Sequence, residues 1–454
     1  MPPGPPASAA PGSVTRGRAG TARALAVEAL VRVEAGAFSN LVLPGLLAAS
    51  GLAPRDRALA TDLVYGTLRH QGQADHLLAL VADRPLVTLD PPVRAALRLG
   101  VHQLLAGVPP HAAVGETVGA LASGPAARAR SYVNAVLRRV AELGPSWPWP
   151  EGEGPAALAV RTSHPQWVVE RLQQDLGPAD ALRTLEAANA PPPVTLRPNP
   201  LRTTTAALAA ELEAAGVEVA LGTLVPDALL VRGTGDLARL PAVAEGRATP
   251  QDQASQAVAT AVGACPGEDI LDLAAAPGGK ATALAEAMGD TGRVLAADLR
   301  PGRARRVLEA GRRLGLASVH TVVADGRAPP VRPGAFDRVL VDAPCSGLGV
   351  LRRRPESRWR LQPDDVDRAA GLQRRLLTAA AGAARPGGLV AYSVCTLTRS
   401  ETAAIDEWAA AELPGLVAEA PPGSPWRPAG RGAILLPHAA GTDGMYLLLL
   451  RVTG

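Results

Sequence analysis

The sequence predicts a multidomain chain, with an all-helical domain first, a small α/β module next and a large α/β domain with a mainly parallel sheet last. Three observations support this prediction. The chain has 454 residues, which is more than one hydrophobic core usually serves. Apolar residues recur at helical spacing near the N-terminus. Between residues 269 and 395, apolar runs typical of buried parallel strands end one after another in a glycine loop, an aspartate or a cysteine.

We expect five segments along the chain. They are a disordered tail rich in Pro, Gly and Ala (1–18), an all-helical domain (19–143), a Pro-rich linker (144–162), a small α/β module (163–248) and the large α/β domain (249–454). The helical prediction depends on apolar residues at i, i+3, i+4 and i+7, namely Ala26, Ala29, Leu30 and Val33. After Cys395, the runs 433–436 and 445–452 flank a glycine-containing turn and predict a closing antiparallel hairpin.

Composition limits the class of protein. The three cysteines include no CxxC pair, which excludes a disulfide framework, makes a zinc site unexpected and indicates a reducing cytosol. We expect no metal. No uninterrupted apolar stretch of about 18 residues offers a membrane span, and the Pro-rich N-terminus lacks the apolar core of a signal peptide. A cytoplasmic protein without membrane contact is therefore expected.

Arginines are concentrated in two stretches of this mildly basic chain, whose formal net charge is +4. Residues 303–313 and residues 352–360 each contain five Arg and one Glu. Such patches predict contacts with phosphate backbones. The first stretch is equally well explained as the solvated face of a helix. The second favours nucleic acid more strongly, because Trp359 stands among its arginines and an aromatic ring can stack on a base.

Lys280 is the only lysine among 46 basic residues, and it follows a glycine turn. A compact ammonium there suggests a place that a guanidinium does not fit. The strand, the turn and the helix that follows it predict a cofactor cradle. Its residues are Ala274, Ala275, Ala276, Pro277, Gly278, Gly279 and Lys280. A phosphate-binding Walker loop needs Gly at position 274, and a dinucleotide loop needs GxGxxG, so S-adenosyl-L-methionine is the remaining common user of such a cradle.

The next apolar runs end in acids and thiols. Asp298 ends one run and is expected to accept hydrogen bonds from ribose hydroxyls, and Asp325 ends the next and is expected to meet the adenine amino group. Asp342 with Cys345 follows a third run, and Cys395 follows a fourth. Since ligands bind at the carboxyl ends of parallel strands, both thiols should lie at one edge of the sheet. For either cysteine alone, an inert buried thiol is the simpler interpretation.

These motifs resemble those of a known family. Ala276–Lys280, Asp342–Gly347 and the Cys395 segment, in this order, are similar to the RNA cytosine-5 methyltransferases, and most of all to the bacterial ribosomal RNA small-subunit methyltransferase B family. The resemblance covers roughly residues 20 to 454. One departure is Val394, where the family often has Thr, and this puts the local hydrogen bonding in doubt.

The resemblance implies a fold and a reaction. It implies a Rossmann-like S-adenosylmethionine methyltransferase domain preceded by a NusB-like RNA-binding domain, acting on C5 of a cytosine in 16S ribosomal RNA. The RNA is expected free or incompletely assembled, and the enzyme as a monomer. By resemblance, Cys395 attacks C6, Cys345 releases the product, and Asp342 binds the N3 and N4 edge of the base.

Three other functions fit parts of the sequence. A transfer RNA cytosine-5 methyltransferase would share every catalytic residue. A non-catalytic NusB-like RNA-binding or antitermination protein would explain the helical domain and the arginines, but not the cradle or the two thiols. A thiol hydrolase would need a histidine, and only His438 follows Cys395.

Overall fold

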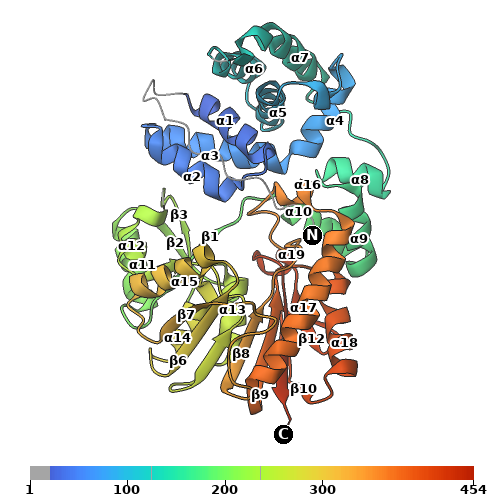
Figure 1. Cartoon of the computed structure of the whole chain (residues 1–454). Coiled ribbons are helices and arrows are strands. Elements are labelled where there is room, and N and C mark those ends of the chain that lie inside the picture. Colours follow the sequence, from blue (N-terminus) through green and yellow to red (C-terminus); the bar gives the residue numbers. More distant parts are fainter. Residues whose placement is uncertain (1–20, 124, 236, 454) are drawn as a thin grey trace, which may run out of the picture. The chain divides into compact units, whose positions relative to one another are not determined.

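The structure is a computed structural model (Figure 1). It describes residues 21–123, 125–235 and 237–453, so the tail expected over residues 1–18 lies outside the described residues. Contacts divide the described chain into two units. Unit 1 comprises residues 21–65 and 81–142, and unit 2 comprises residues 66–80 and 143–453. Among the described residues, no helix is both long enough and apolar enough to cross a membrane.

All regular elements of unit 1 within the described residues are helical. They are α1 (Ala22–Glu34), α2 (Ser39–Ala49), most of α3 (Pro54–Arg69), η1 (Leu86–Thr88), α5 (Pro91–Leu105), α6 (Pro110–Ala120), η2 (Pro125–Ala129) and α7 (Arg130–Leu143). Helix α1 begins where the Thr21 hydroxyl accepts a hydrogen bond from the Ala24 N–H. The four residues of the predicted apolar stripe are buried on one face of α1, which confirms the helical prediction.

Unit 2 contains a nine-stranded sheet in the order β11-β12-β13-β9-β8-β5-β6-β7, with β10 paired to β13. Its parallel strands are β5 (Asp269–Asp272), β6 (Arg293–Asp298), β7 (Val319–Val323), β8 (Phe336–Asp342) and β9 (Ala384–Val394). Its antiparallel strands are β10 (Leu416–Ala418), β11 (Arg427–Ala429), β12 (Gly432–Leu435) and β13 (Met445–Val452). The predicted closing hairpin is confirmed by the pairing of β12 with β13.

Helices cover both faces of this sheet. One face packs against α13 (Gln253–Val262), α14 (Gly279–Ala287) and α15 (Pro301–Leu314). The other face packs against α8 (Pro155–Arg161), α9 (Gln166–Leu176), α10 (Pro178–Ala187), α17 (Pro363–Ala383) and α18 (Ala403–Glu412). Successive strand residues alternate between the faces, so Leu340 joins the first core while Val339 and Val341 join the second. Burial on both faces explains why the parallel strands are continuous apolar runs.

The small module is a four-stranded antiparallel sheet in the order β2-β3-β1-β4. Its elements are β1 (Val194–Pro198), α11 (Thr205–Ala214), β2 (Glu218–Leu221), β3 (Leu229–Arg232), η3 (Leu237–Arg239), α12 (Pro241–Ala244) and β4 (Ala248–Pro250). It has a core of its own, built from residues such as Leu196, Leu208 and Leu229.

The structure differs from the expected segmentation at two points. Within the expected linker, residues Pro155–Arg161 form α8. Within the expected module, α9 and α10 pack into the core of the large sheet and not into the module core. The apolar residues of α9, such as Val168 and Leu172, predict a buried face, but no local pattern tells which sheet buries it.

The remaining elements of unit 2 are short or flank the sheet. They are α4 (Gln71–Val81), α16 (Ser357–Arg360), η4 (Arg399–Glu401) and α19 (Pro437–Ala440).

Candidate active site

The five parallel strands end at one edge of the sheet, because each is a direct neighbour of the next (Figure 1). The glycine loop follows β5, Asp298 is the last residue of β6, and Asp342 is the last residue of β8. Cys395 directly follows β9, and Asp342 is in register with Ser393 of that strand. The structure therefore brings the sequence-predicted site residues to a single edge.

The glycine loop is held tightly between β6 and α15. The Ala275 N–H donates to the Ala297 carbonyl of β6 at 3.0 Å. Gly278 has a φ of +106°, and a Cβ added there would lie 3.1 Å from Val307 Cα of α15. Both the conformation and the close approach require glycine at this position. Helix α14 begins at the next residue, so its first N–H groups face the strand ends.

Lys280 is buried and paired with Asp342. Its Nζ lies 2.8 Å from Asp342 Oδ2 and 3.3 Å from the Ser255 hydroxyl. Burial is the largest single influence and lowers the pKa of Lys280, but Asp342, together with Cys395 and Asp272, raises that pKa above its ordinary value. Asp342 also accepts a hydrogen bond of 2.9 Å from the Ser393 hydroxyl. One third of the Asp342 side chain stays exposed, so the carboxylate is oriented and yet reachable.

Asp272, the last residue of β5, is a site residue that the sequence analysis did not single out. It is 1% exposed, its Oδ1 accepts the Ala274 N–H at 3.3 Å, and its Oδ2 has no partner among the described residues. Burial, and then the charge of Asp342, raise the pKa of Asp272 to about 7. The sequence did contain a signal for Asp272, because this residue lies just before the glycine loop and ends the same kind of apolar run as Asp298 and Asp342.

The two thiols lie in contact. Cys345 Sγ and Cys395 Sγ are 3.3 Å apart, and each side chain is only partly buried. The hydrogen bond with Cys395, and then burial, raise the pKa of the Cys345 thiol well above its ordinary value. Cys345 is therefore protonated at neutral pH. Across the described residues, no group of three or more His, Cys, Asp or Glu side chains is arranged to hold a metal ion.

The two acids at strand ends that are expected to bind the nucleoside part of the cofactor, Asp298 and Asp325, each form an ion pair with an arginine. Asp298 is 5% exposed and lies 3.0 Å from Arg303 Nε. Asp325 lies just beyond β7 and accepts hydrogen bonds from the Arg327 side chain on both oxygens. The side-chain hydrogen bond with Arg327 lowers the pKa of Asp325 to about 2, so this carboxylate is ionised at neutral pH.

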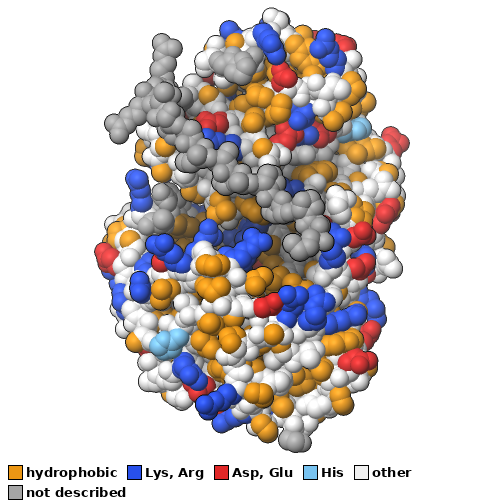
Figure 2. Space-filling model, in the orientation of Figure 1, with side chains coloured by type: hydrophobic (Ala, Val, Ile, Leu, Met, Phe, Trp, Pro, Cys, Tyr) orange, Lys and Arg blue, Asp and Glu red, His pale blue; other side chains and the backbone are white. Residues whose placement is uncertain are grey.

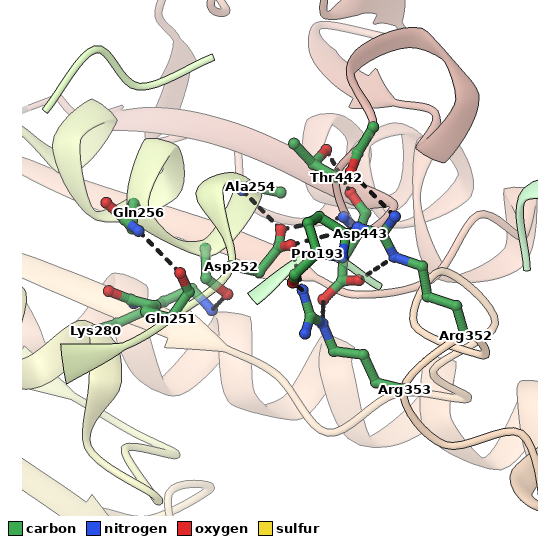
Figure 3. Close-up of polar contacts among 12 residues, drawn as sticks. Pro193, Gln251, Asp252, Ala254, Gln256, Lys280, Arg352, Arg353, Thr442 and Asp443 are labelled. Atoms are coloured by element: carbon green, nitrogen blue, oxygen red, sulfur yellow. Dashed lines mark hydrogen bonds and ion pairs between the residues drawn. The ribbon is translucent and has the colours of Figure 1, made fainter. Parts of the chain in front are cut away.

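The arginines at 352–353 correct one expectation, because Arg352 is buried and both side chains are held by ion pairs with two acids of the same unit (Figure 3). Arg352 Nε lies 2.9 Å from Asp443 Oδ1, and Arg353 Nε lies 2.6 Å from Asp443 Oδ2. Both guanidinium groups also contact Asp252 Oδ2. This charged quartet, in which 31% of the Arg353 side chain stays exposed, joins the loop after β8 to the start of α13 and to the loop before β13.

Arg358 corrects the same expectation. It is fully buried and donates to the Ser163 carbonyl at 3.0 Å and to Asn189 Oδ1 at 2.7 Å. Burial lowers its pKa to about 9. The edge of the Trp359 ring packs against Gly72 of α4, where an added Cβ would lie 2.8 Å from the ring. The 352–360 stretch is mainly structural, and Arg354 is its exposed residue.

The other arginine stretch lies on α15 and is divided between the interior and the surface. Arg313 donates to the Ala248 carbonyl at 2.9 Å and joins α15 to the small module. Arg305 is paired with Glu309 one turn later. The side chains of Arg306 and Arg312 are exposed and have no hydrogen bond or ion pair with any described residue. Figure 2 shows basic side chains gathered on the visible face of unit 2.

Known proteins share this arrangement. Residues 259–451 match the family model described as 16S rRNA methyltransferase RsmB/F, residues 20–142 match the NusB family, and residues 164–238 match a Methyltr_RsmF/B-like, ferredoxin-like domain. The protein named "Probable ribosomal RNA small subunit methyltransferase B" of Bacillus subtilis (strain 168) is 36% identical over 95% of this chain and 99% of its own length. This chain belongs to the ribosomal RNA small subunit methyltransferase B family.

Other relatives agree with this membership. Ribosomal RNA small subunit methyltransferase B of Pseudomonas putida is 34% identical over 93% of this chain and 97% of its own length. The solved structure of a methyltransferase homolog protein from Pyrococcus horikoshii is 25% identical, with a TM-score of 0.58, and covers 66% of this chain and 100% of its own. The cofactor of the ribosomal RNA small subunit methyltransferase B family is S-adenosyl-L-methionine, and the fold expected from the sequence is confirmed.

Proposed function

We propose that this protein methylates C5 of a specific cytosine in 16S ribosomal RNA through a covalent bond between Cys395 and C6 of the base. The family and the names of the relatives support the substrate class. One observation carries the chemistry. The thiols of Cys345 and Cys395 lie 3.3 Å apart at the carboxyl ends of neighbouring parallel strands, beside the Asp342 carboxylate.

Cys395 acts as the nucleophile in this proposal. C5 of cytosine is a weak nucleophile, so a thiolate first adds to C6 and turns the ring into an enamine. A thiolate is suited to this step because it adds readily and leaves again. The partial exposure of Cys395 leaves its sulfur accessible to an unstacked base.

Cys345 acts in product release. After C5 carries the methyl group, its proton has to be removed before the Cys395 thiolate can leave. The largest cause of the raised pKa of Cys345 is its hydrogen bond with Cys395. That bond is lost once Cys395 forms a thioether with C6, so the pKa of Cys345 falls during the reaction. A larger fraction of Cys345 is then thiolate, the form that accepts the C5 proton, directly or through a water molecule.

Asp342 orients the cytosine. Its Oδ2 is paired with Lys280 and its Oδ1 accepts from Ser393, so the carboxylate has a defined direction. Its exposed part can accept a hydrogen bond from the amino group of the base. Lys280 and Ser393 thus position a residue that contacts the substrate.

The strand ends fit S-adenosyl-L-methionine, which supplies an electrophilic methyl group when bound. The glycine loop offers backbone N–H groups without side-chain obstruction, and buried Asp272 Oδ2 is an acceptor without a described partner. We assign the cofactor contacts to Ala274, Ala275, Ala276, Pro277, Gly278, Gly279, Lys280, Asp298, Asp325 and Asp342.

Two cysteine variants test the reaction. Cys395→Ala is expected to abolish both methyl transfer and any covalent enzyme–RNA species. Cys345→Ala is expected to accumulate a covalent species that survives denaturing electrophoresis. Full activity of the first variant, or normal turnover of the second, contradicts the assignment of the thiols.

The RNA target needs its own experiment. Bisulfite sequencing of total RNA from a deletion strain is expected to lose one cytosine mark in 16S ribosomal RNA, which we propose is modified before the small subunit is fully assembled. Loss of a transfer RNA mark instead would overturn the choice of substrate. We propose that the monomer is the active form, and light scattering of the pure protein checks this.

A further inference from the structure

A buried carboxylate lies directly behind the two thiols. Glu401, the last residue of η4, is 0% exposed. Oxygen Oε1 accepts from the Ser346 N–H at 2.8 Å and from Gln373 Nε2 at 3.1 Å. Oxygen Oε2 lies within hydrogen-bond distance of the hydroxyls of Ser346, Thr396 and Thr398, at 2.5, 3.0 and 2.8 Å. Five donors thus converge on one side chain.

These donors belong to the loops that carry the cysteines. Ser346 follows Cys345, and Thr396 follows Cys395. The hydroxyls of Ser346 and Thr396 also lie 2.7 Å from each other. Gln373 of α17 adds a third connection, since its amide donates to the carbonyl of Pro344, the residue before Cys345, at 3.0 Å. The Glu401 carboxylate therefore connects the loop that carries Cys345 with the loop that carries Cys395, on both sides of the 3.3 Å contact between the two sulfurs.

A purely structural role does not explain a charged side chain at this position. Within the described residues, no Lys, Arg or His forms an ion pair with Glu401, so its charge is compensated by dipolar donors alone. Burying a carboxylate without a cation is costly, and a neutral side chain usually serves packing better. Only a carboxylate, however, accepts from this many donors without presenting a donor of its own.

The charge of Glu401 also acts on the thiols. It is one of the groups that raise the pKa of Cys345, after the hydrogen bond with Cys395, burial and the charge of Cys395. Glu401 thereby favours the protonated form of Cys345 while Cys395 is free. This electrostatic effect and the hydrogen-bonded connection act on the same pair of sulfurs.

We propose that Glu401 is a positioning residue, which holds the Cys345 and Cys395 loops together so that the two sulfurs stay in contact. The catalytic purpose of this contact rests on the proposed function, because the nucleophile and the release group have to reach the same base. The sulfur contact itself is a property of the folded chain and can be measured without RNA or cofactor.

The first measurement is the equilibrium between the two thiols and glutathione. Oxidised glutathione converts the Cys345 and Cys395 thiols to a disulfide and is reduced to two molecules of glutathione thiol, and the equilibrium constant reports how well the fold holds the sulfurs together. We expect Glu401→Gln to lower this constant at least tenfold relative to the parent protein, because the amide NH₂ cannot accept the hydrogen bonds of one carboxylate oxygen. Peptide mapping of acid-quenched samples identifies the disulfide.

The matched control is Tyr392→Phe. The Tyr392 hydroxyl donates to the backbone carbonyl of Glu401 at 2.8 Å, so this variant loses a buried hydrogen bond to the same residue without touching its carboxylate. We expect its thiol equilibrium and its turnover to remain within twofold of the parent. An equal loss in Tyr392→Phe and Glu401→Gln would show that the carboxylate has no special role and would overturn the proposal.

The second measurement separates the steps of the reaction. With RNA and cofactor, Glu401→Gln is expected to lower turnover at least tenfold and to accumulate the covalent enzyme–RNA species, as Cys345→Ala does. A loss of folded protein alone would lower adduct and product together. Thermal unfolding shows whether each variant is folded, and if Glu401→Gln is not, Thr396→Val removes one donor and is expected to lower the thiol equilibrium constant two- to fivefold.

The outcomes distinguish the two proposals. If Cys395→Ala still methylates RNA, the proposed function fails, and the thiol equilibrium of Glu401→Gln still decides the role of Glu401. If the cysteine variants behave as proposed but Glu401→Gln, or Thr396→Val in its place, leaves the thiol equilibrium within twofold of the parent, the positioning role alone is wrong.

Discussion

Lys280 Nζ lies 2.8 Å from Asp342 Oδ2, so the single lysine of the chain is paired with the carboxylate that ends β8. The pair connects the glycine loop, where the cofactor is proposed to bind, with the residue proposed to hold the cytosine. Because Lys280 is buried, its ammonium contributes more to the orientation of Asp342 than an exposed cation would.

Loss of the Lys280 charge is expected to disable the site. Lys280→Met leaves Asp342 and Asp272 as neighbouring carboxylates without their cation, so we expect kcat/KM for methyl transfer to fall about a hundredfold or more. Transfer of a labelled methyl group to a 16S RNA transcript measures this. Lys280→Arg keeps the charge and is expected to recover only part of the activity, since a guanidinium is larger than the buried ammonium. Full activity of Lys280→Met would contradict the proposed role.

Asp272 is expected to make stability depend on pH. Its pKa is about 7 in the folded chain against an ordinary value near 3.8, so the folded chain keeps a proton that the unfolded chain releases. Stability therefore falls as pH rises from about 4 to about 7 and does not return above that range. The difference between these two pKa values corresponds to about 4 kcal/mol at most.

The variant Asp272→Asn tests this dependence, because an amide carries no charge to bury. We expect its unfolding free energy relative to the parent to increase between pH 5 and pH 8, as measured by urea unfolding. Asp269→Asn, at the exposed start of β5, is the control and is expected to show a constant difference over this range. A constant difference for Asp272→Asn would show that Asp272 is ionised in the folded chain.

The charged quartet of Arg352, Arg353, Asp252 and Asp443 is expected to stabilise unit 2. Arg352→Met removes a cation from between Asp443 and Asp252, and we expect a loss of about 3 kcal/mol in the free energy of unfolding. Arg354→Met, two residues later on the exposed surface, is expected to change it by less than about 0.5 kcal/mol. Chemical denaturation compares the two, and equal effects would contradict the difference in burial.

Gly349 is expected to tolerate no side chain. Its N–H donates to the Cys395 carbonyl at 3.0 Å, and an added Cβ would lie 2.3 Å from the Gly444 carbonyl oxygen and 2.9 Å from the Cys395 carbonyl oxygen. Gly349→Ala should therefore displace the Cys395 loop and lower methyl transfer at least about tenfold. Gly371→Ala is the control, because a Cβ added at Gly371 would lie 3.8 Å from the nearest atom and would meet no clash. Gly371 lies inside α17, where Ala is a better helix former than Gly, so we expect this variant to gain up to about 1 kcal/mol in stability. Retained activity in Gly349→Ala would show that the loop can move without loss.

The exposed arginines of α15 are expected to contact RNA phosphates. Replacement of Arg306 and Arg312 by Gln should weaken RNA binding and reduce the slope of log affinity against log salt by about 1 for each lost contact. Filter binding at several salt concentrations measures the slope. Arg385→Gln, near the amino end of β9, is an exposed control at the opposite edge of the sheet. An equal change of the salt slope in Arg385→Gln would indicate a general attraction between the basic protein and RNA, and no specific contact by α15.

The sequence alone determined the parallel strands, the glycine loop and the positions of Asp298, Asp342, Cys345 and Cys395. These predictions depend on short-range patterns, because a strand buried on both faces needs a continuous apolar run and its end needs a turn. In a parallel sheet, the ends of neighbouring strands then coincide without further information. The helical stripe of α1 was predictable for the same reason, since period alone places its apolar residues on one face.

Only the tertiary structure decided which charged residues face inward. Arg352 meets Asp443 across 91 residues of sequence, and Ser346 meets Glu401 across 55. The arginine-rich stretch at 352–360 looked like an RNA surface because composition reports charge but not burial. Whether a buried charge finds a partner depends on residues far away in the chain. The sheet that buries α9, the pairing of Lys280 with Asp342 and the hydrogen bonds from Ser346 and Gln373 to Glu401 were all set by such distant contacts.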